Sequence, residues 1–227
     1  MTHRTAISWS GGKDSCLALE HAASRGLRAD TLLTMVDPGG LSKSHSLPTD
    51  LLAAQANALG ARLLPVVADV KDYGAVFLAT LRSLREAGTT HMVFGDIDLQ
   101  AHRDWLEPLC RSAEIEAVFP LWGMTRKAVA SDILERGIRA TVVCVDTRWL
   151  DESFCGVPYD QTFLDRLPQG VCPCGENGEF HTFVWDAPSF SEPIRCIDGP
   201  ARRVRSLPPF APTEFVFQSP TLRSGTV

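Results

Sequence analysis

The stretch Ser8-Trp9-Ser10-Gly11-Gly12-Lys13-Asp14-Ser15 lies between an expected short strand, residues 5–9, and an expected helix that ends at Gly26. A loop at the N-terminus of a helix exposes backbone N–H groups without intrahelical partners, and the helix dipole favours an anion there. The paired glycines allow the backbone to approach phosphate oxygens closely, and Lys13 adds a positive charge. The stretch therefore predicts a phosphate-binding loop between a strand and a helix.

The spacing within this stretch excludes two common phosphate loops. A Walker A loop needs a glycine five residues before Gly12, where the chain has Ile7, and the dinucleotide fingerprint does not fit either. The stretch instead matches Ser-Gly-Gly-x-Asp-Ser, the pyrophosphate loop of enzymes that cleave ATP between its α and β phosphates. We expect the matching residues to bind ATP. They are Ser10, Gly11, Gly12, Lys13, Asp14 and Ser15.

Beyond the loop, strand-like and helix-like runs alternate along the chain. The expected strands are residues 31–36, 63–68 and 91–94, and the expected helices between them are residues 51–59 and 75–87. This alternation predicts an α/β fold with a doubly wound, mostly parallel, Rossmann-like sheet that is covered by helices on both faces. In such a sheet the ligand binds beyond the carboxyl ends of the strands.

Candidate binding residues follow two of these strand ends. The loop 37–47 carries His45, which can hydrogen-bond a nucleotide or substrate but can equally be a solvated loop residue. After the strand 91–94 come Gly95 and Asp96, and Asp96 can hold Mg²⁺ or a water. Arg103, on the helix that follows, can pair with an α-phosphate or a substrate carboxylate, although helix charges are usually solvated.

The sequence pattern of the chain changes near residue 121, after which prolines and expected loops become frequent. We expect an ATP-binding domain over residues 1–120 and a smaller C-terminal α/β substrate-binding domain over residues 121–227. The most distinctive stretch of the second domain is 172–182, Cys-Pro-Cys-Gly-Glu-Asn-Gly-Glu-Phe-His-Thr. It places Glu176, Glu179 and His181 close together, more chemistry than a structural turn needs.

The composition of the chain excludes several classes of protein. The chain has 227 residues, is 44% hydrophobic and carries a net charge of −5, without a broad basic surface, so we expect no nucleic-acid partner. No segment is apolar enough to span a membrane, and no apolar leader precedes the first strand, so we expect a cytoplasmic protein. The seven cysteines lie mostly in apolar runs, so we expect no disulfide framework.

Five motifs in order resemble the diphthine:ammonia ligase family of pyrophosphate-loop ATPases, in a compact bacterial-type form. They are residues 10–15, residues 95–97 with Arg103, residues 120–123, residues 150–154 with Gly156, and residues 174–182. The resemblance spans about residues 5 to 190. It implies a Rossmann-like sheet of the HUP type.

The resemblance also implies a reaction. ATP adenylates a carboxylate and releases pyrophosphate, and ammonia then displaces AMP to leave an amide. The cofactors implied are ATP and Mg²⁺, with Mg²⁺ held by Asp14 or Asp96. Because bacteria lack diphthamide although many of their proteins carry these motifs, the acceptor is left open between diphthine and a small metabolite.

Roles for individual residues follow from the same resemblance. Residues 10–15 hold the leaving pyrophosphate while Lys13 neutralises its charge, and adenine lies near Met35. Glu176, Glu179 and His181 face the α-phosphate, where they bind substrate, orient ammonia or accept its proton. No spacing argument assigns one of these roles to each.

Two rival functions stay open at this point. Cys172 stands where the compact pattern often has aspartate, and with Cys174 it could carry sulfur, as in pyrophosphate-loop enzymes that thiolate tRNA. The other rival is a sensor that binds ATP without turnover. The C-terminal stretch from Arg195 is either an edge strand or a tail that packs on a partner subunit, which leaves a homo-oligomer open.

Overall fold

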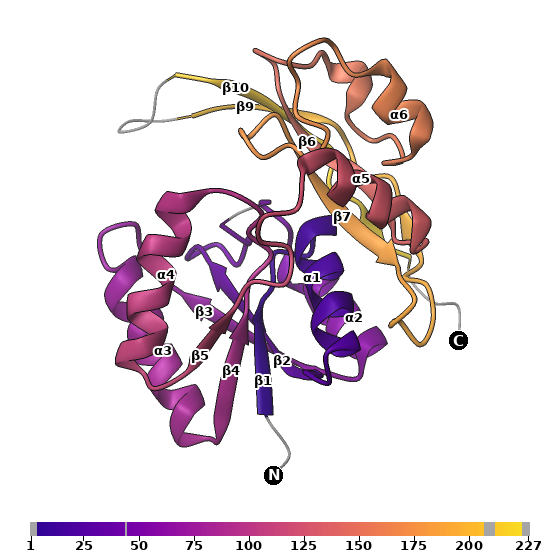
Figure 1. The fold of residues 1–227 in the computed structure, drawn as a ribbon. Coiled ribbons are helices and arrows are strands. Elements are labelled where there is room, and N and C mark those ends of the chain that lie inside the picture. The colour runs from indigo at the N-terminus through magenta and orange to yellow at the C-terminus, as the bar shows by residue number, and fades with distance from the viewer. Residues whose placement is uncertain (1–3, 44, 207–211, 224–227) are drawn as a thin grey trace.

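The computed structural model describes residues 4–43, 45–206 and 212–223. Its first half contains a five-stranded parallel sheet in the order β3-β2-β1-β4-β5 (Figure 1). The strands are β1 (Arg4–Ser8), β2 (Ala29–Val36), β3 (Arg62–Val67), β4 (Thr89–Val93) and β5 (Glu116–Val118). The connecting helices are α1 (Lys13–Ser24), α2 (Thr49–Leu59), α3 (Tyr73–Glu86) and α4 (Gln100–Ser112). The α/β fold predicted from the alternating pattern is confirmed, and β5 is a strand that the pattern did not reveal.

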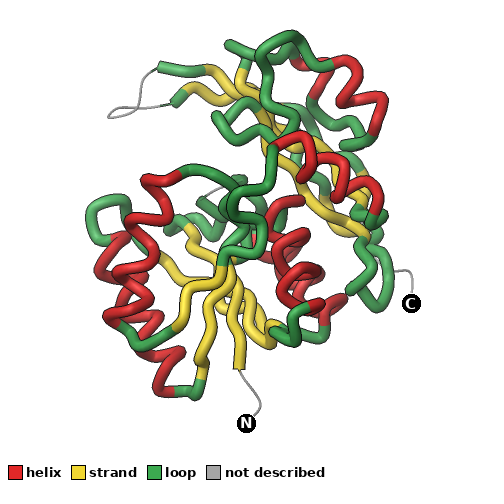
Figure 2. The backbone as a smooth tube through the Cα atoms, in the orientation of Figure 1, coloured by secondary structure: helices red, strands yellow, loops and turns green. Residues whose placement is uncertain are grey.

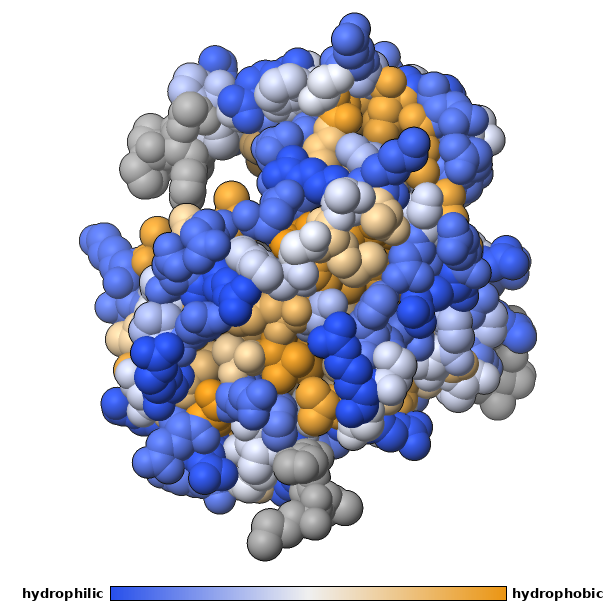
Figure 3. Space-filling model, viewed as in Figure 1, coloured by the Kyte–Doolittle hydropathy of each residue, from blue (hydrophilic) through white to orange (hydrophobic). Residues whose placement is uncertain are grey.

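The two faces of this sheet bury alternate residues of the same strands. On β1, Ala6 packs toward α3 and α4, whereas its neighbour Ile7 packs toward α1 and α2. This alternation is what a strand with a period of two residues requires when helices cover both faces. The helices lie on opposite sides of the sheet in Figure 1, so the sheet is doubly wound as expected. On the face shown in Figure 3, apolar residues gather where β4 and the edge strand β5 lie.

The second half of the chain forms a four-stranded antiparallel sheet in the order β7-β6-β10-β9. Its strands are β6 (Arg139–Asp146), β7 (Phe180–Asp186), β9 (Arg202–Arg205) and β10 (Glu214–Phe217). The helices α5 (Arg126–Glu135) and α6 (Gln161–Arg166) and the 3₁₀ turn η1 (Glu152–Phe154) accompany this sheet, and β8 (Cys196–Ile197) pairs with β11 (Thr221–Leu222). The second half of the chain is thus built on an antiparallel sheet, whereas its expected extent and its role as a substrate-binding domain stay predictions.

The order of the parallel strands fixes where a ligand can bind. The chain runs from β1 through β2 to β3 on one side and resumes with β4 on the other side of β1, so β1 and β4 flank a topological switch point. Figure 2 shows the loops at these strand ends lying between the two sheets. Among the described residues, no helix is long and apolar enough to cross a membrane.

Candidate active site

A cavity of about 500 Å³ lies at the switch point. One end is polar, with hydroxyl and carboxylate groups from the loops after β1 and β4 and from the second half of the chain. The other end is apolar, with aromatic side chains from α3 and α4. The lining residues are Ser8, Ser10, Asp14, Ser15, His45, Tyr73, Phe77, Phe94, Gly95, Asp96, His102, Trp105, Leu106 and Glu176. Six of the predicted binding residues and Glu176 therefore face one cavity.

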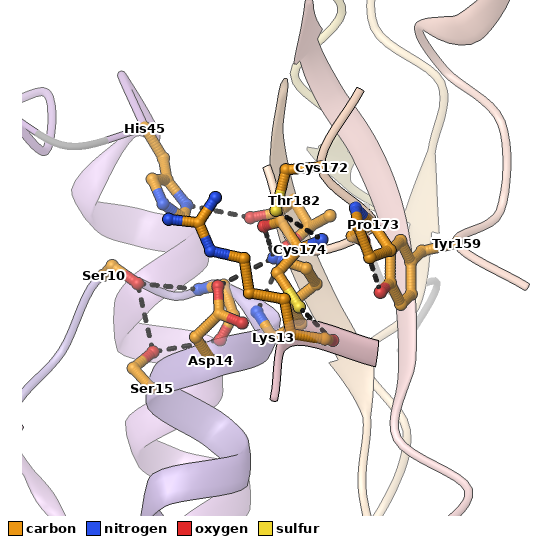
Figure 4. Close-up of polar contacts among 12 residues, drawn as sticks. Ser10, Lys13, Asp14, Ser15, His45, Tyr159, Cys172, Pro173, Cys174 and Thr182 are labelled. Carbon is orange, nitrogen blue, oxygen red and sulfur yellow. Dashed lines mark hydrogen bonds and ion pairs between the residues drawn. The ribbon is translucent and has the colours of Figure 1, made fainter. Parts of the chain in front are cut away.

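The polar end begins at the N-terminus of α1, where Gly12 is the N-cap and no side chain caps the helix. The hydroxyl groups of Ser10 and Ser15 lie 3.1 Å apart, and the Gly12 N–H donates to Ser10 Oγ at 3.2 Å (Figure 4). These donors and the helix dipole make the polar end suited to an anion.

Gly95 allows the end of β4 to lie directly against the start of α1. A Cβ atom at this position would come within 3.0 Å of the Ser15 backbone nitrogen and 3.1 Å of the Asp14 carbonyl. Contacts that short with backbone atoms force the strand end and the helix apart. Glycine at position 95 therefore closes the crevice around the loop.

The phosphate loop is also held by β7 of the second sheet. The Val184 N–H donates to the Gly11 carbonyl at 2.9 Å, and the Lys13 N–H donates to Thr182 Oγ1 at 3.1 Å. One apolar core also joins the two halves of the chain, since α1 residues such as Leu17 pack in the same cluster as Val142 and Phe183. The loop of the first half is thus shaped by a strand of the second.

Lys13, predicted to neutralise the charge of the pyrophosphate, is not among the residues that line the cavity. Its ammonium group donates to Asp14 Oδ2 at 2.7 Å and to the Cys174 carbonyl at 2.5 Å, with only 2% of the side chain exposed. It lies over the rings of Tyr159 and Phe180. Burial alone would lower the pKa of Lys13, but the charge and hydrogen bond of Asp14 together with the nearby Cys174 and Glu176 raise the pKa overall. Lys13 is therefore a buried cation that joins the loop to the segment 172–182.

Asp14 and Asp96 both line the cavity, as expected of metal ligands. Asp14 Oδ1 is buried and has no hydrogen-bond partner, whereas Asp96 Oδ1 contacts His102 Nδ1 at 2.9 Å. An unpartnered buried carboxylate oxygen is costly, and Mg²⁺ prefers one or two carboxylates together with substrate phosphates. The residues present therefore fit Mg²⁺, although no group of three metal-ligating side chains occurs among the described residues.

Glu176 reaches the cavity from the second half of the chain. Burial raises the pKa of Glu176 to about 8, and the nearby negative charge of Asp14 adds to this, while Lys13 opposes it. A carboxyl group with a pKa near neutrality can both release and accept a proton at physiological pH. Glu176 thus has the position and the acidity of a general acid or base.

Glu179, grouped with Glu176 by the sequence, does not line the cavity. It is fully buried, and its carboxylate accepts hydrogen bonds from the backbone N–H groups of Cys172 and Asn177 and from the Asn177 side chain, all at 2.8–2.9 Å. A carboxylate held by several donors fixes the surrounding turn. Glu179 therefore shapes the segment that carries Glu176.

His181 and His45 form a ring pair with centroids 4.6 Å apart. His45 Nδ1 contacts the Thr182 carbonyl at 2.9 Å, so this nitrogen carries the proton and Nε2 is an acceptor. Burial lowers the pKa of His181 to about 4 and that of His45 well below its usual value, with the charge of Lys13 contributing to both. Both rings are neutral near pH 7, and only His45 lines the cavity.

Two predicted ligands lie outside the cavity lining. Met35 is buried in the core, and its carbonyl accepts from the Lys43 N–H, so the loop after β2 folds over this strand end. The Arg103 side chain donates to Glu107 at 2.6 Å and stacks on Trp122. Neither of these two side chains lines the cavity with the phosphate loop.

The aromatic wall was missed by the sequence reasoning. Tyr73 and Phe77, one turn apart on α3, face Trp105 of α4 with ring centroids 5.6–5.8 Å away. The spacing of Tyr73 and Phe77 marks one helix face, but the sequence does not show that α4 lies beside it. Aromatic side chains that line a cavity can stack against a planar group.

Cys172 and Cys174 are buried and do not line the cavity. A hydrogen bond with Cys174 and the charge of Arg126 lower the pKa of Cys172 to about 5, whereas the same hydrogen bond and burial raise the pKa of Cys174. Cys174 also donates to the Arg126 carbonyl at 3.0 Å. The two thiols are therefore packed in the protein interior, whereas Glu176 of the same segment faces the cavity.

This chain is similar to several curated proteins in sequence and to a solved structure in fold. A protein named diphthine--ammonia ligase from Bos taurus is 25% identical over 240 residues, covering 94% of this chain and 90% of the relative. The Homo sapiens protein of that name is 28% identical over 116 residues, 49% of this chain and 43% of the relative. A solved structure, described as a predicted subunit of tRNA methyltransferase from Methanocaldococcus jannaschii, covers 80% of this chain and 96% of that chain with a TM-score of 0.44 and 17% identity.

Family models match most of the chain. Residues 3–117 match the model described as the diphthamide synthase N-terminal domain, and residues 125–203 match the diphthamide synthase C-terminal domain. These two matches occur in order and include both the phosphate loop and Glu176. The chain therefore belongs to the diphthamide synthase family.

Proposed function

We propose that the protein is an ATP-dependent ligase that adenylates a carboxylate, releases pyrophosphate and uses ammonia to form an amide and AMP. One observation carries the proposal: the phosphate loop at the start of α1 and Glu176 of the second half face the same cavity. Such an arrangement brings an anion-binding end and a proton-transfer group to one reacting centre. Family membership and the names of the relatives support it.

ATP would lie along the cavity. Its phosphates would bind the loop at Ser10, Gly12 and Ser15, and its adenine would stack at the aromatic end against Tyr73 or Trp105, rather than beside Met35 as the sequence suggested. The polar end supplies N–H and hydroxyl donors for the phosphates, and the aromatic end supplies a surface for the base. The cavity volume of about 500 Å³ is within the usual range of small-molecule sites.

Asp14 and Asp96 would hold Mg²⁺ together with the phosphates. When bound, Mg²⁺ neutralises the charge of the polyphosphate and of the leaving pyrophosphate. Lys13 keeps Asp14 in place through their ion pair. The unpartnered Oδ1 of Asp14 supports this role.

The chemistry proceeds in two displacements. A carboxylate oxygen of the acceptor attacks the α-phosphorus of ATP, the bond to the β-phosphate oxygen breaks, and pyrophosphate leaves. Ammonia then attacks the acyl carbon of the mixed anhydride, AMP leaves, and the nitrogen loses a proton. We assign that proton to the Glu176 carboxylate, while the donors of residues 10–15 stabilise the charge on the leaving pyrophosphate.

The acceptor is a carboxylic acid. The relatives are named for diphthine, and either diphthine or a small metabolite carboxylate is consistent with the cavity. Sulfur transfer, the main rival, would need an accessible thiol at the reacting centre, but Cys172 is 5% exposed and does not line the cavity.

Hydroxylamine trapping tests the proposal. Wild-type protein is incubated with MgATP, a metabolite extract and hydroxylamine in place of ammonium, and hydroxamates are detected by mass spectrometry. We expect an ATP-dependent hydroxamate whose acid identifies the acceptor, and none with the Asp14→Asn variant. ATP consumption by the wild type without any hydroxamate, or a thiolated product instead, would contradict amide formation.

A further inference from the structure

We infer that Gln55, a buried residue of α2, is a positioning residue that holds the Gly11–Gly12 peptide so that its N–H group points at the bound pyrophosphate portion of ATP. The inference rests on the proposed function, because it gives the loop a phosphate to bind. None of the sequence motifs includes Gln55. Its role follows from the hydrogen bonds that it makes inside the fold.

Gln55 is fully buried and links three parts of the chain that meet at the loop. Its Nε2 donates to the Gly11 carbonyl at 2.9 Å and to the Val184 carbonyl at 2.7 Å, and its Oε1 accepts from Trp9 Nε1 at 2.8 Å. The indole N–H can only donate and the two carbonyls can only accept, so one orientation of the amide satisfies all three groups. Trp9 thereby fixes which side of the Gln55 amide faces Gly11.

The Gly11 carbonyl receives two donors on the same side of the loop, Gln55 Nε2 and the Val184 N–H. Because the peptide is planar and trans, the Gly12 N–H must point in the opposite direction. On that side it donates to Ser10 Oγ, and Ser10 lines the cavity. Holding the carbonyl therefore aims the N–H at the phosphate end.

Without this restraint the peptide is unusually free to turn over. Gly11 has φ +81°, and glycine populates positive and negative φ about equally. A turned peptide would present the Gly11 carbonyl oxygen to the phosphates, replacing a donor with a repelling acceptor. Donors fixed before the ligand arrives need no reorganisation on binding, which is why orientation at this peptide affects affinity.

The test uses two buried substitutions with different effects on the loop. Gln55→Met keeps the length and burial of the side chain but removes its donors. Leu51→Met replaces a buried apolar side chain of the same helix by one of similar volume, leaves Gln55 and Trp9 unchanged and serves as the matched control for core disruption. Binding of inorganic pyrophosphate with Mg²⁺ and binding of adenosine are measured separately by calorimetry, and folding is checked by circular dichroism.

We expect Gln55→Met to bind pyrophosphate about tenfold more weakly or worse, as loss of a hydrogen bond to a charged group does, with adenosine affinity unchanged. Leu51→Met should bind both ligands as the wild type does. Unchanged pyrophosphate binding by Gln55→Met, or an equal loss for adenosine, would overturn the positioning role. If the wild type binds neither ligand, the proposed function itself fails.

A second variant covers the case in which Gln55→Met does not fold. Val184→Pro removes the other donor to the Gly11 carbonyl, on the edge of β7 that faces the loop rather than β6. The same selective loss of pyrophosphate binding is expected. Full pyrophosphate affinity in this variant would overturn the inference that the orientation of this peptide governs anion binding.

Discussion

Glu176 is the residue on which the proposed nitrogen-transfer step depends. With a pKa of about 8, its carboxylate form increases as the pH rises through that value. Glu176→Gln keeps the size of the side chain but cannot accept a proton. We predict that the ammonium-dependent rate of amide formation is about 10²–10⁴-fold lower in this variant than in the wild type. ATP binding, measured by calorimetry, should be retained.

Replacing ammonium by hydroxylamine distinguishes a role of Glu176 as a base from a role in substrate binding. Hydroxylamine is already unprotonated near neutral pH, so it depends less on a base than ammonium does. At a fixed concentration of free ammonia, the wild-type rate should rise with pH up to about 8, and Glu176→Gln should recover more activity with hydroxylamine than with ammonium. Equal losses with both nucleophiles would assign Glu176 to substrate binding instead.

The histidine pair makes stability depend on pH. The pKa of His181 is about 4 in the folded protein, below the usual 6.5, because the ring is buried beside Lys13. Protons therefore bind the unfolded chain first, and the free energy of unfolding should fall as pH falls from about 6.5 to about 4. Urea unfolding at several pH values measures this, and His181→Gln should lose less over that range. An equal loss of unfolding free energy in the wild type and in His181→Gln would contradict the assignment of this pH dependence to His181.

At the scale of single residues, the sequence predicted the groups that local spacing brings together. Ser10, Asp14 and Ser15 lie within one loop, and their place at a helix N-terminus follows from neighbouring residues alone. The sequence could not distinguish the role of Glu176 from that of Glu179. The conformation of the turn decides which carboxylate accepts hydrogen bonds from backbone N–H groups and which faces the cavity.

The junction of β4 and α1 is the element-scale feature that closes the site. Gly95→Ala places a Cβ atom 3.0 Å from the Ser15 nitrogen. We predict a loss of about 1–3 kcal/mol in the free energy of unfolding, as overpacking costs, and weaker ATP binding. Denaturant titration and calorimetry measure both quantities.

Gly74→Ala in α3 is the matched control for this prediction. The Cβ atom added there has no neighbour nearer than 3.7 Å, and alanine favours a helix over glycine. This variant should retain or gain stability. If Gly95→Ala binds ATP as tightly as the wild type does, close packing of β4 on α1 is not needed for the site.

Elements with strong periodicity were predicted well, since α2 spans 49–59 where residues 51–59 were expected. The strand β7 was not predicted, because its segment follows a turn rich in polar residues and its pairing with β6 is set by residues some 40 positions earlier. Contacts that are distant in sequence also placed Arg103 against Trp122 rather than at the cavity.

At the scale of the whole molecule, the division into domains 1–120 and 121–227 stays a prediction. One apolar cluster joins Ile7 and Leu17 of the first half to Val142 and Phe183 of the second. We predict that the two halves unfold together, because separating them exposes this core. Hydrogen exchange should show the same protection for β1 and β6. A second half that opens independently would contradict this coupling.

The fate of labelled ATP tests whether residues 10–15 support cleavage of ATP between its α and β phosphates. Wild-type protein and Asp14→Asn are given α- or γ-labelled ATP with Mg²⁺, ammonium and a metabolite extract. We predict labelled AMP and labelled pyrophosphate, both of which require the extract and Asp14. Labelled ADP and phosphate, or equal cleavage by the two proteins, would contradict it.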